Sequence, residues 1–186
     1  GGLSHQADEA ESEAQRSRAL YEMARELTGA ASIEQIVKIT RKFLGKVFNA
    51  DVTILLPDDA DTLQVCVERE TSCFLIEPRL ARMVFDGGAP IECPQQPGSG
   101  YPAMYLPLNA SDRVRGVLAV ALPDGQVRHF QGQGERLAAM ASLVAIAIER
   151  VYYADVARQT QVQVASERLR SSILSAVSHD LRTPLT

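Results

Sequence analysis

The last part of the chain contains almost no residue that can end a helix. Gly134 is the last glycine, and Pro184 is the one proline after it. A helix can therefore run from about residue 135 without interruption. At about 1.5 Å per residue, roughly 50 residues would form a helix about 70–75 Å long. No domain of the size that 186 residues allow could cover this length, so we expect the helix to protrude and to pair with another helix.

Apolar residues follow this helix as a stripe whose phase changes. The first half has one stripe at helical spacing, formed by Leu137, Met140, Ala141, Val144, Ile148 and Val151. After about Tyr153 the sequence becomes polar, with apolar residues recurring at Val162, Leu169, Ile173, Ala176 and Val177. These positions do not fit one strict heptad, so we predict a phase shift near 155–165 and a homodimer formed through the C-terminal helix.

The residues before this helix indicate an α+β domain. We expect a helix that ends near Gly29 and a second one opened by a capping box of Ser32 and Gln35. Further along, we predict a hairpin of strands 52–56 and 63–68, a short helix from about 77 to 85, a loop from 89 to 100, and a hairpin of strands 103–108 and 114–122. This order predicts an antiparallel sheet with flanking helices, followed by the long C-terminal helix.

Composition and charge exclude several classes of function. The net charge is −4, and no cluster of Lys and Arg predicts nucleic-acid binding. Cys66, Cys73 and Cys93 form no CxxC and lack the histidines that a zinc site needs, so we interpret them as reduced thiols. The acidic run at 58–61 is typical of a turn, and we predict no metal site there. No stretch reaches the about 20 consecutive apolar residues of a membrane helix, and no signal peptide is visible.

The C-terminal string Ser178-His179-Asp180-Leu181-Arg182-Thr183-Pro184-Leu185 carries the chemistry. On a helix, Leu181 and its neighbours one turn away share an apolar face, and His179 is turned away from that face. An exposed imidazole beside a carboxylate is a plausible nucleophile for a phosphoryl group. Thr183 lies one turn after His179, and Pro184 should bend the helix.

This string resembles the phosphoacceptor box of the histidine-kinase dimerisation domain. The resemblance implies that His179 is phosphorylated, that Asp180 assists phosphotransfer, and that Thr183 helps position water when the response regulator is dephosphorylated. Upstream there is no Gly-rich nucleotide lid and no Asn-bearing box. We therefore expect no cofactor in this chain, ATP and Mg²⁺ in a longer parent protein, and no self-phosphorylation by this piece alone.

The preceding 130 or so residues resemble a GAF domain, and in particular the GAF region of the sensor kinases of Kdp potassium-uptake systems. The resemblance rests on Leu20-Tyr21, on the segments 24–27, 81–90, 106–108 and 116–118, and on Ala147-Ile148-Glu149-Arg150. It implies a KdpE-like response regulator as partner, control of potassium transport, and a cytoplasmic position in an inner-membrane protein whose membrane helices precede this chain. Met83 and the segment 91–99 depart from the pattern, so any ligand of the GAF domain stays unidentified.

We divide the chain accordingly into a membrane-proximal linker helix (1–19), a GAF sensor domain (20–150), a signalling helix (151–174) and the truncated start of the dimerisation and phosphoacceptor domain (175–186). Two alternatives stay open. A stand-alone GAF enzyme could reduce free methionine sulfoxide through its cysteines, although such an enzyme would end near Arg150. A GAF domain that binds nothing could instead serve as a dimerisation scaffold.

Overall fold

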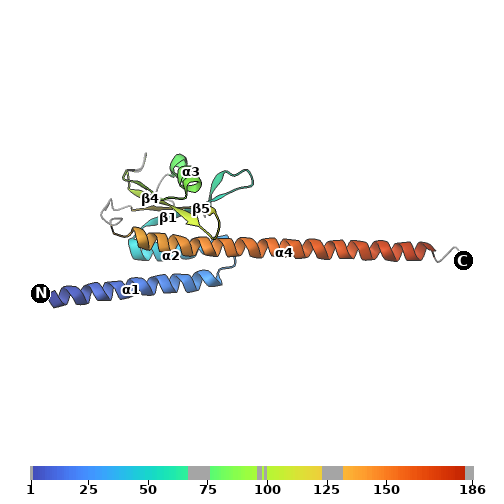
Figure 1. Ribbon diagram of the computed structural model, residues 1–186, viewed down its shortest axis with the longest axis horizontal. Coiled ribbons are helices and arrows are strands. Elements are labelled where there is room, and N and C mark those ends of the chain that lie inside the picture. Colours follow the sequence, from blue (N-terminus) through green and yellow to red (C-terminus); the bar gives the residue numbers. More distant parts are fainter. Residues whose placement is uncertain (1, 67–75, 96–97, 99, 123–131, 183–186) are drawn as a thin grey trace. The chain divides into compact units, whose positions relative to one another are not determined.

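The computed structural model describes residues 2–66, 76–95, 98, 100–122 and 132–182. The chain divides into two compact units, Gly1–Glu149 and Arg150–Thr186. The elements, in chain order, are α1 (Gly2–Gly29), α2 (Ile33–Phe48), β1 (Asp51–Pro57), β2 (Leu63–Cys66), α3 (Pro78–Gly87), β3 (Ile91–Cys93), β4 (Ala103–Asn109), β5 (Val114–Ala121) and α4 (Gly134–Arg182) (Figure 1). The predicted α+β class, with an antiparallel sheet and a long C-terminal helix, is confirmed.

The five strands form one antiparallel sheet in the order β2-β1-β5-β4-β3. Both predicted hairpins are present, β1 with β2 and β4 with β5, and β5 also pairs with β1 at the centre of the sheet. Gly116 of β5 lies against the backbone of β1 at Leu55. A Cβ atom there would clash with the backbone oxygen of Leu55 and lie 2.6 Å from the Leu56 side chain, so the central strand pairing requires glycine at this position.

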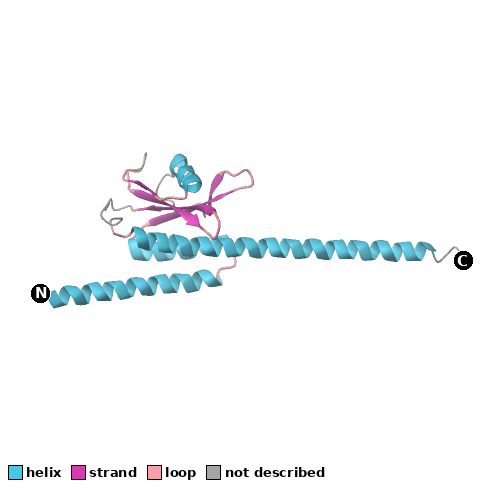
Figure 2. Ribbon diagram, viewed as in Figure 1, coloured by secondary structure: helices cyan, strands magenta, loops and turns pink. Residues whose placement is uncertain are grey.

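Helices cover both faces of the sheet (Figures 1 and 2). On one face, Ala81 and Val84 of α3 pack on a cluster that includes Tyr105 and Val117. On the other face lie α2 and the part of α4 up to Glu149, with α1 against the outer side of α2. Because β1 is covered from both sides, its residues from Val52 to Leu55 are all buried, as is usual for a strand between two helical layers.

The predicted loop at 89–100 contains a strand that the sequence analysis missed. Residues Ile91–Cys93 form β3, which pairs with Ala103–Tyr105 of β4 at the edge of the sheet. The prediction of an uninterrupted loop is therefore wrong. Prolines at 90 and 94 bracket the strand, and three residues are too few to show an alternating pattern between such breakers.

The other edge strand, β2, has the predicted alternation but incomplete cover. Leu63 packs against the cluster under α3, and Val65 lies on the same face because it pairs with Leu55. Yet Val65 is 45% exposed. At the edge of a sheet, a side chain on the inner face has neighbours on one side alone, so periodicity predicts its direction better than its burial.

The start of α2 confirms the capping prediction with one difference. The Ser32 hydroxyl accepts a hydrogen bond from the Gln35 backbone N–H (3.3 Å), as a capping residue should. The Gln35 side chain reaches back to the N–H of Ala31 (2.7 Å), one residue before the cap. At the other end Asn49 adopts a left-handed conformation (φ 50°) and its N–H binds Gly45 O, which ends the helix.

The long C-terminal helix is confirmed as one element of 49 residues. Its predicted first stripe is buried, from Leu137 to Ile148. By length and composition, α4 is the one helix among the described residues that could cross a membrane, with a mean hydropathy of 1.5 in its most apolar window. Of that window, 44% is buried inside the structure.

Candidate phosphoacceptor site

The predicted phosphoacceptor, His179, lies in the last turn of α4. This turn belongs to the unit 150–186, in which the helix from residue 156 to residue 182 is exposed along its whole surface. The helix persists there because residues 135–182 contain neither glycine nor proline. His179 is therefore held by one rigid helical backbone, on a surface that another protein could approach.

The imidazole and its neighbouring carboxylate have the expected exposure. The His179 side chain is 84% exposed and that of Asp180 is 87% exposed. Asp180 Oδ1 lies 3.9 Å from His179 Nδ1, which is too far for a hydrogen bond but close enough for electrostatic interaction.

The remaining part of the predicted site lies outside the described residues. Thr183, Pro184 and Leu185 belong to the segment 183–186, so the roles expected of the threonine and of the proline stay predictions. The structure thus places His179 and Asp180 together, and leaves Thr183 as an expectation from the sequence.

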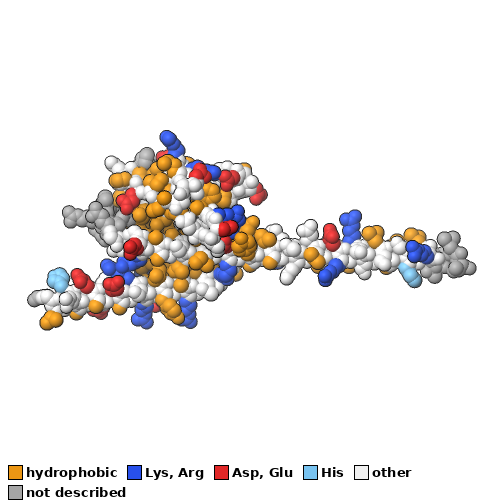
Figure 3. All heavy atoms as spheres, viewed as in Figure 1, with side chains coloured by type: hydrophobic (Ala, Val, Ile, Leu, Met, Phe, Trp, Pro, Cys, Tyr) orange, Lys and Arg blue, Asp and Glu red, His pale blue; other side chains and the backbone are white. Residues whose placement is uncertain are grey.

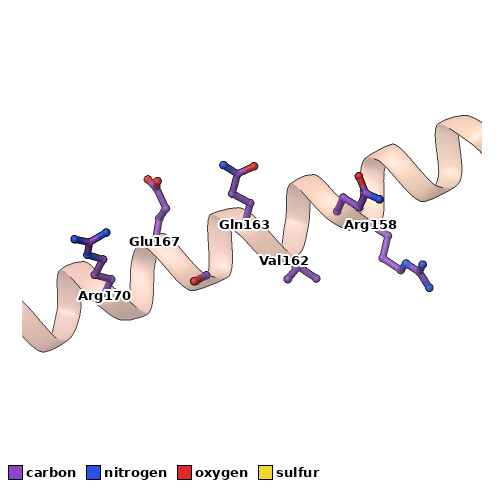
Figure 4. A pocket seen from close by; sticks show the side chains of 7 residues that line it. Arg158, Val162, Gln163, Glu167 and Arg170 are labelled. Carbon is purple, nitrogen blue, oxygen red and sulfur yellow. The ribbon is translucent and has the colours of Figure 1, made fainter. Parts of the chain in front are cut away.

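The helix before His179 presents apolar side chains that are exposed in the part of the chain that the structure describes. Apolar and polar side chains follow one another along it (Figure 3), and the exposed apolar ones include Val162, Leu169, Ile173 and Val177. Gln163, Glu167 and Arg170 point to one side of the ribbon in Figure 4, and Arg158 and Val162 point to the other side. All these side chains come from a single helix, so this surface fits a partner helix better than a small ligand.

At the end of the domain, a buried ion pair joins α4 to the hairpin of β4 and β5. Arg115 Nη2 lies 2.8 Å from Glu149 Oε1, and the two side chains are 7% and 12% exposed. The Ser111 hydroxyl donates to the other carboxylate oxygen at 2.9 Å. The Arg115 guanidinium, followed by the Ser111 hydroxyl, lowers the pKa of Glu149 below its ordinary value.

Sequence reasoning missed this contact. The segment 147–150 carries part of the resemblance to the family, but Ser111 and Arg115 lie more than 30 residues from Glu149 in sequence. The one signal was an arginine in a strand that is otherwise apolar, since a buried arginine needs an acidic partner.

No group of three or more His, Cys, Asp or Glu side chains that could hold a metal is present in the described ranges. The acidic run forms a turn as predicted: the Asp58 carboxylate accepts hydrogen bonds from the N–H groups of Ala60 and Thr62.

Cys66 and Cys93 lie on β2 and β3, at opposite edges of the sheet, which does not favour a cooperating thiol pair. Burial raises the pKa of the Cys66 thiol, so it is a poor nucleophile. Cys73 lies outside the described residues.

These features define a class: an α+β sensory domain that continues into a helix bearing an exposed histidine. A model of the GAF domain matches residues 32–150, and the chain therefore belongs to the GAF domain family. The native GAF domain of the potassium sensor histidine kinase KdpD from Escherichia coli has a similar structure, with a TM-score of 0.63 and 27% identity over 76% of this chain and 98% of that one.

Two curated proteins are similar over almost the whole chain. The sensor protein KdpD of Escherichia coli K12 is 33% identical over 100% of this chain, and the sensor protein KdpD of Clostridium acetobutylicum is 26% identical over 91% of it. The chain spans about a fifth of the length of these relatives. The resemblance to Kdp sensor kinases that the sequence analysis found is thus confirmed beyond the GAF domain, through the helix that carries His179.

Proposed function

We propose that this chain is the sensory and signal-relay segment of a two-component sensor histidine kinase that controls potassium transport. The observation that carries the proposal is the exposed His179–Asp180 pair within the string 178–185, on a helix that begins in a GAF domain. The similarity to KdpD sensor proteins supports the potassium role. We further propose that the chain lies on the cytoplasmic side of an inner-membrane kinase.

In the complete kinase, His179 is the nucleophile. An imidazole nitrogen attacks the γ-phosphorus of ATP; an N–P bond forms as the P–O bond to ADP breaks. Because the Asp180 carboxylate lies on the Nδ1 side of the ring, we assign Nε2 as the attacking nitrogen. Asp180 orients the ring and stabilises the positive charge that develops on it. The ATP and Mg²⁺ are held by a catalytic domain outside this chain, and the phosphoryl group then passes to a KdpE-like response regulator.

The function of the fold in this scheme is to set the geometry of a dimer. We propose that two copies pair through the uncovered apolar side chains of α4, and that a signal shifts the packing of the paired helices between two arrangements. One arrangement presents His179 to the catalytic domain, and the other favours dephosphorylation of the regulator, a step in which Thr183 positions water. A bias of a few kcal/mol between such states is enough to switch the output.

Replacing the histidine tests the proposal directly. In the complete kinase, His179→Gln should abolish labelling by γ-labelled ATP, because glutamine offers no ring nitrogen. His5→Gln changes the same residue type on α1 and should leave labelling unchanged. If the His179 variant kept its label, another residue would be the phosphoacceptor and the assignment would be wrong.

A further inference from the structure

A groove on the GAF unit gathers positive charge from three helices. It has a volume of about 700 Å³, and its lining includes Arg16 of α1, Lys46 of α2 and Arg136 of α4. Arg18 and Glu22 of α1 also line it and pair with each other at 3.4 Å. All of its lining residues belong to the unit 1–149, and its volume is in the range of small-molecule sites, about 300–1,000 Å³. We propose that this groove binds a phosphate group of a small anionic ligand.

The three cations contrast with Lys42 and Arg82 of the same domain, each of which has an acidic partner. Lys42 pairs with Glu26 at 2.7 Å, and Arg82 pairs with Asp61 and with Asp86, at 2.9 Å in each case. In the part of the chain that the structure describes, Arg16, Lys46 and Arg136 form no ion pair with a carboxylate. The whole chain has a net charge of −4, so this positive groove is a local departure from an acidic average.

Arg136 shows that the arrangement is unfavourable without an anion. Its side chain is partly buried, and its Nη1 donates a hydrogen bond to a neutral partner, the Gln133 side-chain oxygen, at 2.6 Å. Burial, followed by the charge of Arg16, lowers the pKa of Arg136, and Glu13 offsets this in part. Two guanidinium groups that repel each other at one groove would both be stabilised by an anion between them.

The first turn of α4 adds to the same field. The helix begins at Gly134, next to Gln133 in the groove, and the N–H groups of a first helical turn carry partial positive charge. Glu135 in this turn is exposed and opposes part of the effect. Two arginines can each bind oxygen atoms in bidentate fashion, so a phosphate dianion matches the groove better than a single carboxylate.

Titration of the whole chain with tripolyphosphate, followed by calorimetry, tests the site. We expect saturable binding that weakens as salt is added. The variants Lys46→Gln and Arg136→Gln should each weaken binding by about ten-fold, since a charge-assisted hydrogen bond is lost. Arg79→Gln removes an exposed arginine from α3 and should leave binding unchanged. Because the three residues are not in the core, thermal unfolding should show that each variant remains folded.

A second binding experiment, with lipid vesicles, distinguishes the source of the phosphate group. Co-sedimentation with vesicles of one part phosphatidylglycerol to three parts phosphatidylcholine shows whether a lipid headgroup occupies the groove. The site is supported if Lys46→Gln and Arg136→Gln lose binding in one of the two experiments while Arg79→Gln keeps it. The experiment in which binding is lost, with tripolyphosphate or with vesicles, then identifies the source of the phosphate. Absence of binding in both experiments, or an equal loss in Arg79→Gln, would overturn the site. The site depends on the GAF unit alone, so its failure would leave the phosphoacceptor assignment intact.

Discussion

At the scale of single residues, the ion pair of Arg115 and Glu149 ties the last domain residues of α4 to the β4–β5 hairpin. Both side chains are almost buried and form an ion pair with each other. Removing one partner of such a pair leaves a buried charge without compensation, which is more destabilising than removing both.

We expect Arg115→Met to lower the melting temperature of the chain by roughly 5 °C, as measured by differential scanning calorimetry. The double variant Arg115→Met/Glu149→Leu should recover most of this loss, because it removes the second charge as well. A double variant that unfolds at the same temperature as Arg115→Met would show that the loss comes from packing and not from the unpaired carboxylate.

The same pair predicts a dependence of stability on pH. The pKa of Glu149 is lowered from its ordinary value of 4.5 in the folded protein, so the unfolded chain binds the proton more readily. The stabilisation from Glu149 is then fully present above pH 4.5 and is lost as the pH falls through the folded pKa. Glu149→Gln should therefore lose less stability than the parent chain between about pH 6 and pH 3. Glu92→Gln, at an exposed position of β3, should behave as the parent does.

At the scale of elements, the exposed apolar residues of α4 define a surface for pairing. Leu169 and Ile173 are four residues apart and both exposed. We expect Leu169→Lys and Ile173→Lys each to weaken dimerisation by about ten-fold or more. Each substitution places a charge where pairing of two α4 helices would bury an apolar side chain.

Sedimentation equilibrium of the whole chain measures this effect. Ser171→Lys is the matched control, because residue 171 lies about 200° around the helix from residue 169 and so faces away from the pairing surface. Equal weakening by all three lysines, or a chain that is monomeric at every concentration, would contradict the pairing of α4.

The elements also show which features the sequence could predict and why it could not predict others. Long patterns were predictable, as in α4, whose stripe of buried residues repeats over several turns. Local chemistry was predictable too, as at Ser32, which caps α2. The strand β3 was not, because three residues between prolines carry no period. The exposed histidine could be predicted from its sequence context, whereas the groove at Arg16 and Arg136 could not, since its residues come together from three helices.

At the scale of the whole molecule, one uninterrupted helix connects the GAF domain with His179. The helix has 3.6 residues per turn, so one added residue rotates everything after it by about 100°, whereas seven added residues nearly restore the original face. The two insertions therefore separate a relay that depends on helix rotation from one that depends on length alone.

The complete kinase with one residue inserted after Ala165 gives the most direct test of the relay. The ratio of His179 phosphorylation to regulator dephosphorylation is measured at low and at high potassium. We predict that the single insertion abolishes the response to potassium, and that an insertion of seven residues at the same place retains it. An unchanged response with the single insertion would contradict transmission of the signal through α4.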